Sequence, residues 1–207
     1  MESRRAYSMA NRTQGVEENR AAVRAAVTSL AAEVRLADIS LAGVAERSGV
    51  SVRTLLRYYG SRDDLIRTVA EEMQDTVLDE RPVFPSDIDR SLDLLGAHYE
   101  AMGPLVLMLL AQETTDPMAR AITTQGKGFH RRWVAQLFGL DVDADTDAEL
   151  LDLLVVSTDV STWKLLRHDR ALGHADAVDR MRQLARAVRS QLATAGDHPT
   201  TSRENRS

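Results

Sequence analysis

Residues 51–58 gather the side chains best able to donate hydrogen bonds to a charged partner. On a helix, Arg53 and Arg57 point away from the face that Leu55 and Tyr59 share. A guanidinium donates two parallel hydrogen bonds to a guanine edge or to a phosphate. Hydroxyl side chains in the same stretch can reach phosphate oxygens; they belong to Ser51, Thr54 and Tyr58. The stretch therefore has the chemistry of a surface that holds and reads a nucleic acid.

The surrounding residues predict two short helices joined by a tight turn and followed by a third helix. Gly49 stands where the turn needs a left-handed backbone, which glycine adopts at little cost. Ser51 is expected to cap the second short helix, and Ser61 the next, whose first turn carries acidic Asp63 and Asp64. This spacing is typical of a helix-turn-helix. The alternative is a plain helical hairpin in an all-α protein.

Residues 44–66, VAERSGVSVRTLLRYYGSRDDLI, resemble the N-terminal domain of the TetR family of transcriptional regulators. The agreement spans a small part of the chain but holds at many positions of fixed spacing. It rests on Val44-Ala45, Ser48-Gly49-Val50-Ser51, Thr54-Leu55, Arg57-Tyr58-Tyr59 and Ser61 to Ile66. The resemblance implies an N-terminal DNA-binding domain of three helices, joined by helix four to a larger helical domain for ligand binding and dimerisation.

Two departures from the family bear on DNA binding. Leu56 stands where the family usually has a tyrosine that bonds phosphate, and Leu41-Ala42-Gly43 begins the second helix with few polar groups. Both predict lighter anchoring to the DNA backbone. Arg62 matches a family lysine that commonly meets that backbone, and the alternative for Tyr58 is partial core packing. The predicted DNA-binding residues are Ser40, Ser51, Val52, Arg53, Thr54, Leu56, Arg57, Tyr58 and Arg62.

Charge is divided unequally along the chain. The whole sequence has a net charge of −5, yet residues 1–62 contain ten arginines against six acidic residues. The remaining residues contain 16 Lys or Arg against 25 Asp or Glu. This partition places attraction for phosphate at the N-terminal end and leaves the rest to repel DNA.

The sequence offers little for catalysis, so we expect no enzyme activity, metal or cofactor. Cysteine is absent, which excludes thiolate sites and disulfides. His98, His130, His168 and His174 lack metal-site spacing, and each is expected to be a surface or satisfied, partly buried residue. The longest apolar run, Leu105 to Ala111, is too short to span a bilayer. We therefore expect a cytoplasmic protein with no membrane partner.

Helical periodicity without strand alternation predicts an all-α fold of about nine helices. The Arg81–Pro85 segment is a stiff break and marks a domain boundary. The expected parts are a disordered arm over 1–16, a DNA-binding domain over 17–80, a ligand-binding and dimerisation domain over 86–195, and a disordered tail over 196–207. Gly103-Pro104 is expected to begin a new helix, and residues 147–167 to form one helix.

Bulky aromatic and methionine side chains gather in the second part of the chain and can line an apolar ligand cavity. The candidates are Tyr99, Met102, Met108, Phe129, Trp133 and Trp163. For any one of them, ordinary helix packing is an equal alternative, and it is the family resemblance that favours a small-molecule pocket.

The Leu150–Val156 run is apolar almost all round, and such a helix needs cover on more than one side. We expect a homodimer closed by the last two helices as a four-helix bundle. Its predicted interface residues are Leu150, Leu153, Leu154, Val178, Met181, Leu184 and Val188.

Together these features indicate a ligand-responsive transcriptional regulator. We expect it to repress by binding a near-palindromic double-stranded operator as a homodimer. We expect a small apolar or aromatic effector to release it from the operator. The alternative is a ligand-sensing or interaction protein of the same fold with weakened DNA binding.

Overall fold

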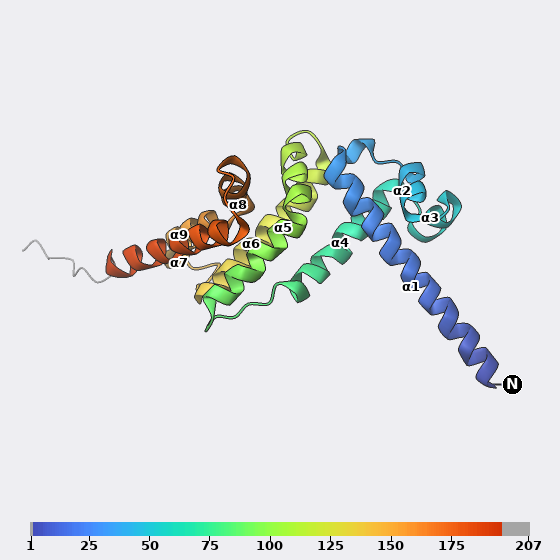
Figure 1. The fold of residues 1–207 in the computed structure, drawn as a ribbon, viewed down its shortest axis with the longest axis horizontal. Coiled ribbons are helices and arrows are strands. Elements are labelled where there is room, and N and C mark those ends of the chain that lie inside the picture. Colours follow the sequence, from blue (N-terminus) through green and yellow to red (C-terminus); the bar gives the residue numbers. More distant parts are fainter. Residues whose placement is uncertain (1, 196–207) are drawn as a thin grey trace, which may run out of the picture. The chain divides into compact units, whose positions relative to one another are not determined.

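The computed structural model describes residues 2–195, and the side chains of 14–77 and 81–190. In that range it has nine α-helices and no strand (Figure 1), which confirms the predicted fold class. A 3₁₀ turn, Leu36–Asp38, follows α1, and a π-helical turn, Leu165–Asp169, follows α8. The helices are α1 (Glu2–Glu33), α2 (Leu41–Ser48), α3 (Val52–Tyr59), α4 (Arg62–Glu80), α5 (Ile88–Gln112), α6 (Pro117–Phe138), α7 (Asp145–Thr158), α8 (Val160–Lys164) and α9 (His174–Ala195).

The described chain divides into two compact units. The N-terminal unit contains the residues up to Glu80 together with Ala101–Lys127. The C-terminal unit contains Arg81–Glu100 and the described residues from Gly128 onward. The change of unit after Glu80 coincides with the break predicted from the prolines.

The predicted C-terminal domain, 86–195, differs from this division. Its residues 101–127 pack with the N-terminal helices, because Leu105, Leu109 and Ala119 share one core with Leu55. Periodicity along a helix shows which face is apolar but not which other helices cover it.

Local sequence signals fix the helix-turn-helix as predicted. Ser40 caps α2 by accepting a hydrogen bond from the Gly43 N–H at 3.1 Å. Gly49 ends α2 in the left-handed region, with φ 71°. Ser51 caps α3 by accepting from the Thr54 N–H at 3.2 Å. These two serines and one glycine set both ends of α2 and the start of α3.

The turn after α1 is anchored by a buried side chain from α5. Leu36 is buried, and its N–H donates to Gln112 Oε1 at 2.8 Å. The amide nitrogen of Gln112 donates in turn to the Met108 carbonyl at 2.7 Å. An unpaired buried amide costs about 1–3 kcal/mol, so these bonds hold the turn against α5.

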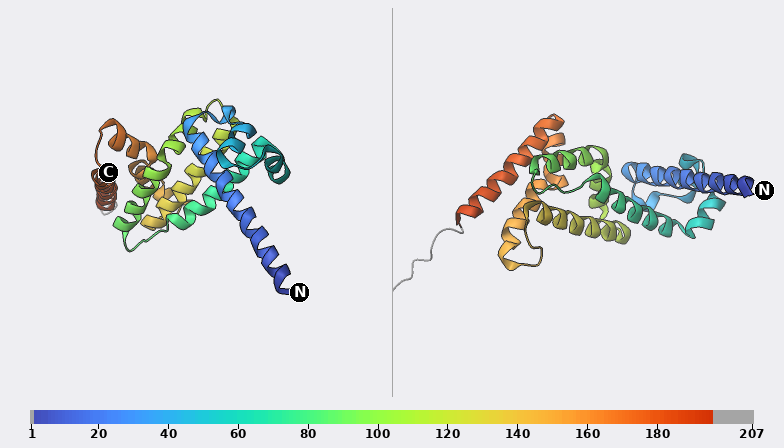
Figure 2. Two further views of the ribbon diagram at one scale, coloured as in Figure 1. Left: turned by 45° about the vertical axis from the view of Figure 1, so that its right-hand side comes forward. Right: turned by 90° about the horizontal axis from the view of Figure 1, so that it is seen from below.

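The first helix is longer than the sequence analysis expected. The structure has α-helix from Glu2, where an arm over 1–16 was predicted to lack regular structure. Residues 2–14 contain neither proline nor glycine, so nothing in them stops a helix that continues from the packed turns. In Figures 1 and 2 the first turns of α1 extend beyond α2 and α3. The tail predicted over 196–207 lies outside the described residues.

One predicted helix start, at Gly103-Pro104, is wrong because α5 continues through Pro104. Proline removes one backbone N–H, and the buried residues on either side of it, Gly103 and Leu105, keep the helix continuous. By length and composition α5 could also cross a membrane. It packs as a core helix, however, with Leu92 and Leu95 buried in the C-terminal unit and Leu105 in the N-terminal unit.

The single helix predicted over 147–167 is also wrong, because the chain breaks at Asp159. Asp159 has an extended backbone, with ψ 153°, and its carboxylate accepts from the Ser161 N–H at 2.8 Å. The hydroxyls of Ser157 and Thr158 donate back to the Leu154 carbonyl at 2.9 and 2.8 Å. Short polar side chains in succession compete with the helix for backbone partners, and here they separate α7 from α8.

Close approach and ion pairs join α5 to α9 in the C-terminal unit. Gly96 is the contact point: a Cβ built there would collide with the Val178 side chain and lie 3.2 Å from His174 Cε1. Beside it, Arg182 of α9 pairs with Asp93 of α5 at 2.7 Å and with Asp89 at 3.1 Å. The helices therefore meet at a position that only glycine fits.

Replacing this glycine tests the contact. Gly96→Ala should lower the free energy of unfolding by about 1–3 kcal/mol, because the added methyl overpacks against Val178. Gly126→Ala is the matched control, since nothing lies within 4 Å of a Cβ at that position of α6. That change should stabilise the protein by up to about 1 kcal/mol through helix propensity. Urea unfolding gives both values, and effects of the same sign would contradict the contact.

Candidate nucleic-acid interface and effector site

The face of α3 predicted to meet DNA is the exposed face of that helix. Leu55 is fully buried, whereas Leu56 is 44% exposed and Tyr58 52% exposed. Arg53 and Arg57 are exposed as well, and Val52 is partly so. The helix register inferred from the sequence is therefore confirmed, and with it the exposure of Leu56.

The two arginines of α3 have no acidic partner in the part of the chain that the structure describes. Among the described residues Arg53 makes no hydrogen bond or ion pair, and Arg57 lies 4.8 Å from the centroid of the Tyr58 ring. A guanidinium over an aromatic face keeps its N–H groups free in its own plane. Both side chains are thus available to a phosphate or a base.

The capping hydroxyls lie at the same surface. Ser40 and Ser51 are exposed, and the Ser51 hydroxyl also donates to Thr54 Oγ1 at 3.0 Å. Thr54 is half-buried. These bonds fix the N-terminus of α3 at this surface.

Arg62 has a structural role that the sequence analysis did not foresee. Its guanidinium donates to the Ile39 carbonyl at 2.8 Å and to the Leu36 carbonyl, and it pairs with Asp63 at 2.6 Å. Helix α4 is thereby tied to the turn after α1. The phosphate contact that the family resemblance implies for Arg62 stays a prediction.

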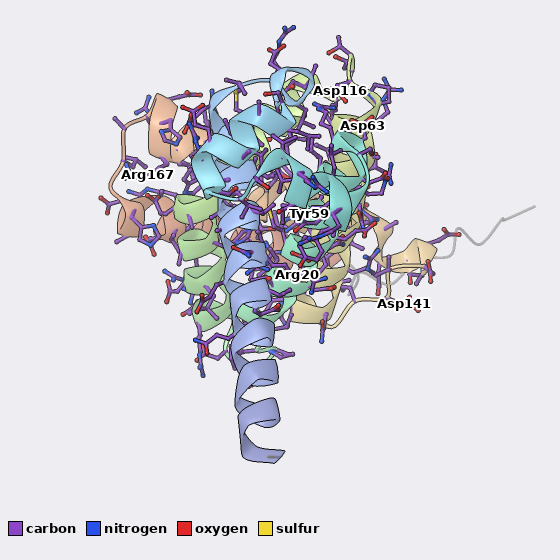
Figure 3. The ribbon with its side chains drawn as sticks, turned by 90° about the vertical axis from the view of Figure 1, so that its right-hand side faces the viewer. Arg20, Tyr59, Asp63, Asp116, Asp141 and Arg167 are labelled. Carbon is purple, nitrogen blue, oxygen red and sulfur yellow. The ribbon has the colours of Figure 1, made fainter. Side chains whose placement is uncertain are left out.

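The inner side of α3 packs over α1. A cavity of about 220 Å³ lies there, lined among others by Arg20, Leu55 and Tyr59. Figure 3 shows Arg20 and Tyr59 close together. Tyr59 is half-buried, and burial raises its pKa. It belongs to the core side of the helix, as the four-residue spacing from Leu55 predicts.

The six side chains proposed for the effector site do not all belong to one unit. Met102 and Met108 are in the N-terminal unit, where Met102 packs against the core. The C-terminal unit holds the four aromatic residues: Tyr99, Phe129, Trp133 and Trp163.

Three of these aromatic side chains are packed into the unit rather than facing open space. Tyr99, Trp133 and Trp163 are buried, and the rings of Tyr99 and Trp163 lie 5.8 Å apart. The Tyr99 hydroxyl donates to the Thr158 carbonyl at 3.0 Å. A hollow of about 830 Å³ in this unit has other lining residues, including Arg131, Ala135 and Leu140. The effector pocket among the aromatic residues stays a prediction.

A buried polar cluster that was not predicted from the sequence lies beside these rings. Arg81 is 4% exposed and His130 is 8% exposed, while His98 is half-buried. Arg81 Nε and the Nδ1 atoms of both histidines are buried without a hydrogen-bond partner. Burial, with the charge of Arg81, lowers the pKa of His98 to about 4 and also lowers that of His130. Both histidines are therefore neutral at pH 7. Nothing in the sequence distinguishes these histidines from surface ones.

The protonated nitrogen of His130 follows from its neighbour. Thr158 Oγ1 donates its one proton to the Leu154 carbonyl, so it accepts from His130 Nε2, 3.2 Å away. His130 Nδ1 has no hydrogen-bond partner among the described residues.

The predicted dimer residues divide into core and surface. Leu154, Val178 and Met181 are buried within the chain itself, so their assignment to an interface is wrong. They fill the space where α7 packs on α9. Leu150 and Val188 are half-buried, whereas Leu153 and Leu184 are 42% and 46% exposed. The sequence analysis missed two further exposed apolar residues, Val156 and Leu165.

Two solved structures of similar fold are both of transcriptional regulators. No protein-family model and no curated protein matches the chain. A crystal structure of a transcriptional regulator from Rhodococcus sp. RHA1 matches 83% of this chain and 96% of its own, with a TM-score of 0.61 and 16% identity. A TetR transcriptional regulator from the same source matches 86% and 98%, with a TM-score of 0.51 and 20% identity. The chain has the TetR-type fold.

In this TetR-type fold Leu56 is the position to test. Leu56→Tyr should fold normally, because the side chain is exposed, and should add a phosphate hydrogen bond. Bonds to charged partners are worth about 1.5–3 kcal/mol, and a phenol at a wet interface should give less. Affinity should rise modestly and equally for all DNA sequences, as measured by fluorescence anisotropy.

The neighbouring residue supplies the control. Leu55→Tyr puts a hydroxyl into the core and should destabilise the protein by at least about 1–3 kcal/mol. Loss of stability in Leu56→Tyr would mean that Leu56 belongs to the core. A gain confined to one sequence would mean that the position reads bases.

Proposed function

We propose that the protein is a ligand-responsive, DNA-binding transcriptional regulator of the cytoplasm. It acts as a repressor that binds a near-palindromic operator as a homodimer and is released by a small apolar or aromatic ligand. The observation that carries the proposal is the exposed face of α3, where Arg53 and Arg57 lack acidic partners while Leu55 anchors the helix in the core. The fold and the basic N-terminal residues support the same reading, and neither suggests an enzyme.

The mechanism follows from the geometry of two half-sites. Recognition helices of a dimer that reads adjacent major grooves lie about 34–36 Å apart. A ligand that shifts α4 by a few ångströms changes this separation and prevents both helices from binding at once. Ligand and operator then oppose each other through thermodynamic linkage.

A second candidate is a ligand sensor of the same fold that has lost tight DNA binding. Leu56 and the apolar start of α2 favour it, and so does Arg62, whose guanidinium is occupied within the chain. A gel shift with DNA from the protein's own promoter region separates the two candidates.

Substitution of the two arginines of α3 tests DNA binding by this helix more specifically than the gel shift alone. Arg53→Ala and Arg57→Ala should each weaken operator binding while leaving the melting temperature unchanged. If Arg53 reads a guanine, its loss should cost about 1–3 kcal/mol and relax preference at one base pair. If it holds phosphate, binding should weaken evenly across sequences.

Arg132→Ala is the matched control, because it removes an exposed arginine from α6 in the C-terminal unit. It should bind like the unaltered protein. Unchanged affinity in both α3 variants would exclude this face as the DNA-binding surface.

The homodimer has its own test. Light scattering at micromolar protein should give a mass near twice the 22.9 kDa of one chain. Val156 is 62% exposed on α7, so Val156→Asp should leave the fold intact and shift the mass toward the monomer. Val142→Asp introduces the same charge at an exposed valine before α7 and should leave the dimer intact. A monomeric unaltered protein would refute the dimer.

A further inference from the structure

Arg81 is a buried cation without an anion. It follows α4 directly and is 4% exposed in the C-terminal unit. It forms no ion pair with any described carboxylate, and its Nε–H has no hydrogen-bond partner. Burial lowers its pKa, but an arginine remains protonated at neutral pH. A buried charge without a partner is costly, so the fold keeps it at the expense of stability.

Two aromatic rings flank this side chain, and one hydrogen bond holds the backbone of the same residue. Its guanidinium carbon lies 5.1 Å from the centroid of the Phe129 ring and 4.9 Å from that of Trp133. The Trp133 indole N–H donates to the Arg81 carbonyl at 3.0 Å. Contacts with ring faces satisfy the guanidinium above its plane, and the Tyr99 hydroxyl accepts one of its in-plane N–H groups, but the buried Nε–H has no partner among the described residues.

The polar groups near Arg81 do not neutralise it. His98 and His130 are both uncharged, and the neutral Tyr99 hydroxyl, which donates to the Thr158 carbonyl, accepts from the guanidinium without supplying a negative charge. Asp159 is near enough to raise the pKa of His130, but its carboxylate is partly exposed and already caps α8. The cluster thus keeps one positive charge, which matches a singly charged anion better than a doubly charged phosphate.

We propose that Arg81 binds the carboxylate of an aromatic monocarboxylic acid, whose ring packs beside the half-buried Phe129. The guanidinium fork donates to the two carboxylate oxygens, a geometry that lysine cannot reproduce. The inference rests on the proposed function, since it names the chemical class of the effector. Because Arg81 is the residue after α4, an anion that fixes its side chain also restrains the end of the helix that leads to the DNA-binding helices.

Matched acids and amides test the charge requirement without DNA. The probes are benzoate, phenylacetate and 3-phenylpropanoate, each beside its primary amide. Binding is followed by tryptophan fluorescence, since both tryptophans lie in the C-terminal unit, and by the melting temperature. At least one acid should bind about tenfold or more tightly than its amide, in line with a charge-assisted pair. Equal binding of each acid and its amide, no binding of any acid at millimolar concentration, or equal competition by inorganic phosphate would overturn the proposal.

Variants then assign the preference to Arg81. Arg81→Met should fold, melt no lower than the unaltered protein without ligand, and bind each acid as weakly as its amide. Arg90→Met is the control, because Arg90 is exposed with its guanidinium 3.9 Å from the Phe84 ring centroid. It should keep the preference. A preference that survives Arg81→Met would refute the assignment. If that variant does not fold, Arg81→Lys, which keeps the charge without the guanidinium fork, replaces it and should lower the affinity for each acid more than that for its amide.

Failure of the acid-binding proposal can be distinguished from failure of the proposed DNA-binding function. If the acids fail to bind while the operator gel shift succeeds, the effector class alone is wrong. If the acids bind while no operator is bound, the protein is an acid sensor and the regulator proposal fails.

Discussion

The turn at Leu36 has to bury its backbone polar groups in an apolar core, and the N-terminal unit is arranged around that requirement. The Leu36 N–H is paired by Gln112 and its carbonyl by Arg62, side chains that come from α5 and α4. Neither partner is close to the turn in sequence, so three separate segments must be in place before the turn is satisfied. The short helices α2 and α3 follow this turn. The orientation of α3 therefore depends on hydrogen bonds made well away from its exposed face.

The helix-turn-helix could be predicted from the sequence because local chemistry decides it. A cap at Ser51, a left-handed glycine at 49 and the four-residue spacing of Leu55 and Tyr59 act within one or two turns. The exposure of Leu56 follows from the same register. Few backbone conformations meet all of these local preferences at once. The helix-turn-helix could therefore be predicted from one sequence alone.

The C-terminal part was harder to predict from the sequence. Its local sequence is compatible with more than one arrangement of the helices, and long-range packing decides between them. Nothing in an apolar run tells whether Leu154 meets α9 of its own chain or a second chain, and the structure places it in the core. Hydroxyl groups at Ser157 and Thr158 break a helix that periodicity alone would continue. Arg81 lay in a segment interpreted as a stiff linker, and its burial depends on rings contributed by α6.

The contact between Gly96 and Val178 also bears on how this sequence can change over time. A larger residue at 96 is tolerable only if position 178 has first become smaller, so substitutions at the two positions should be ordered rather than independent. Among homologues that keep this crossing of α5 and α9, the combined volume of the two side chains should vary less than either volume alone. The crossing would then leave a paired signature in the family's sequences, although the two residues lie far apart along the chain.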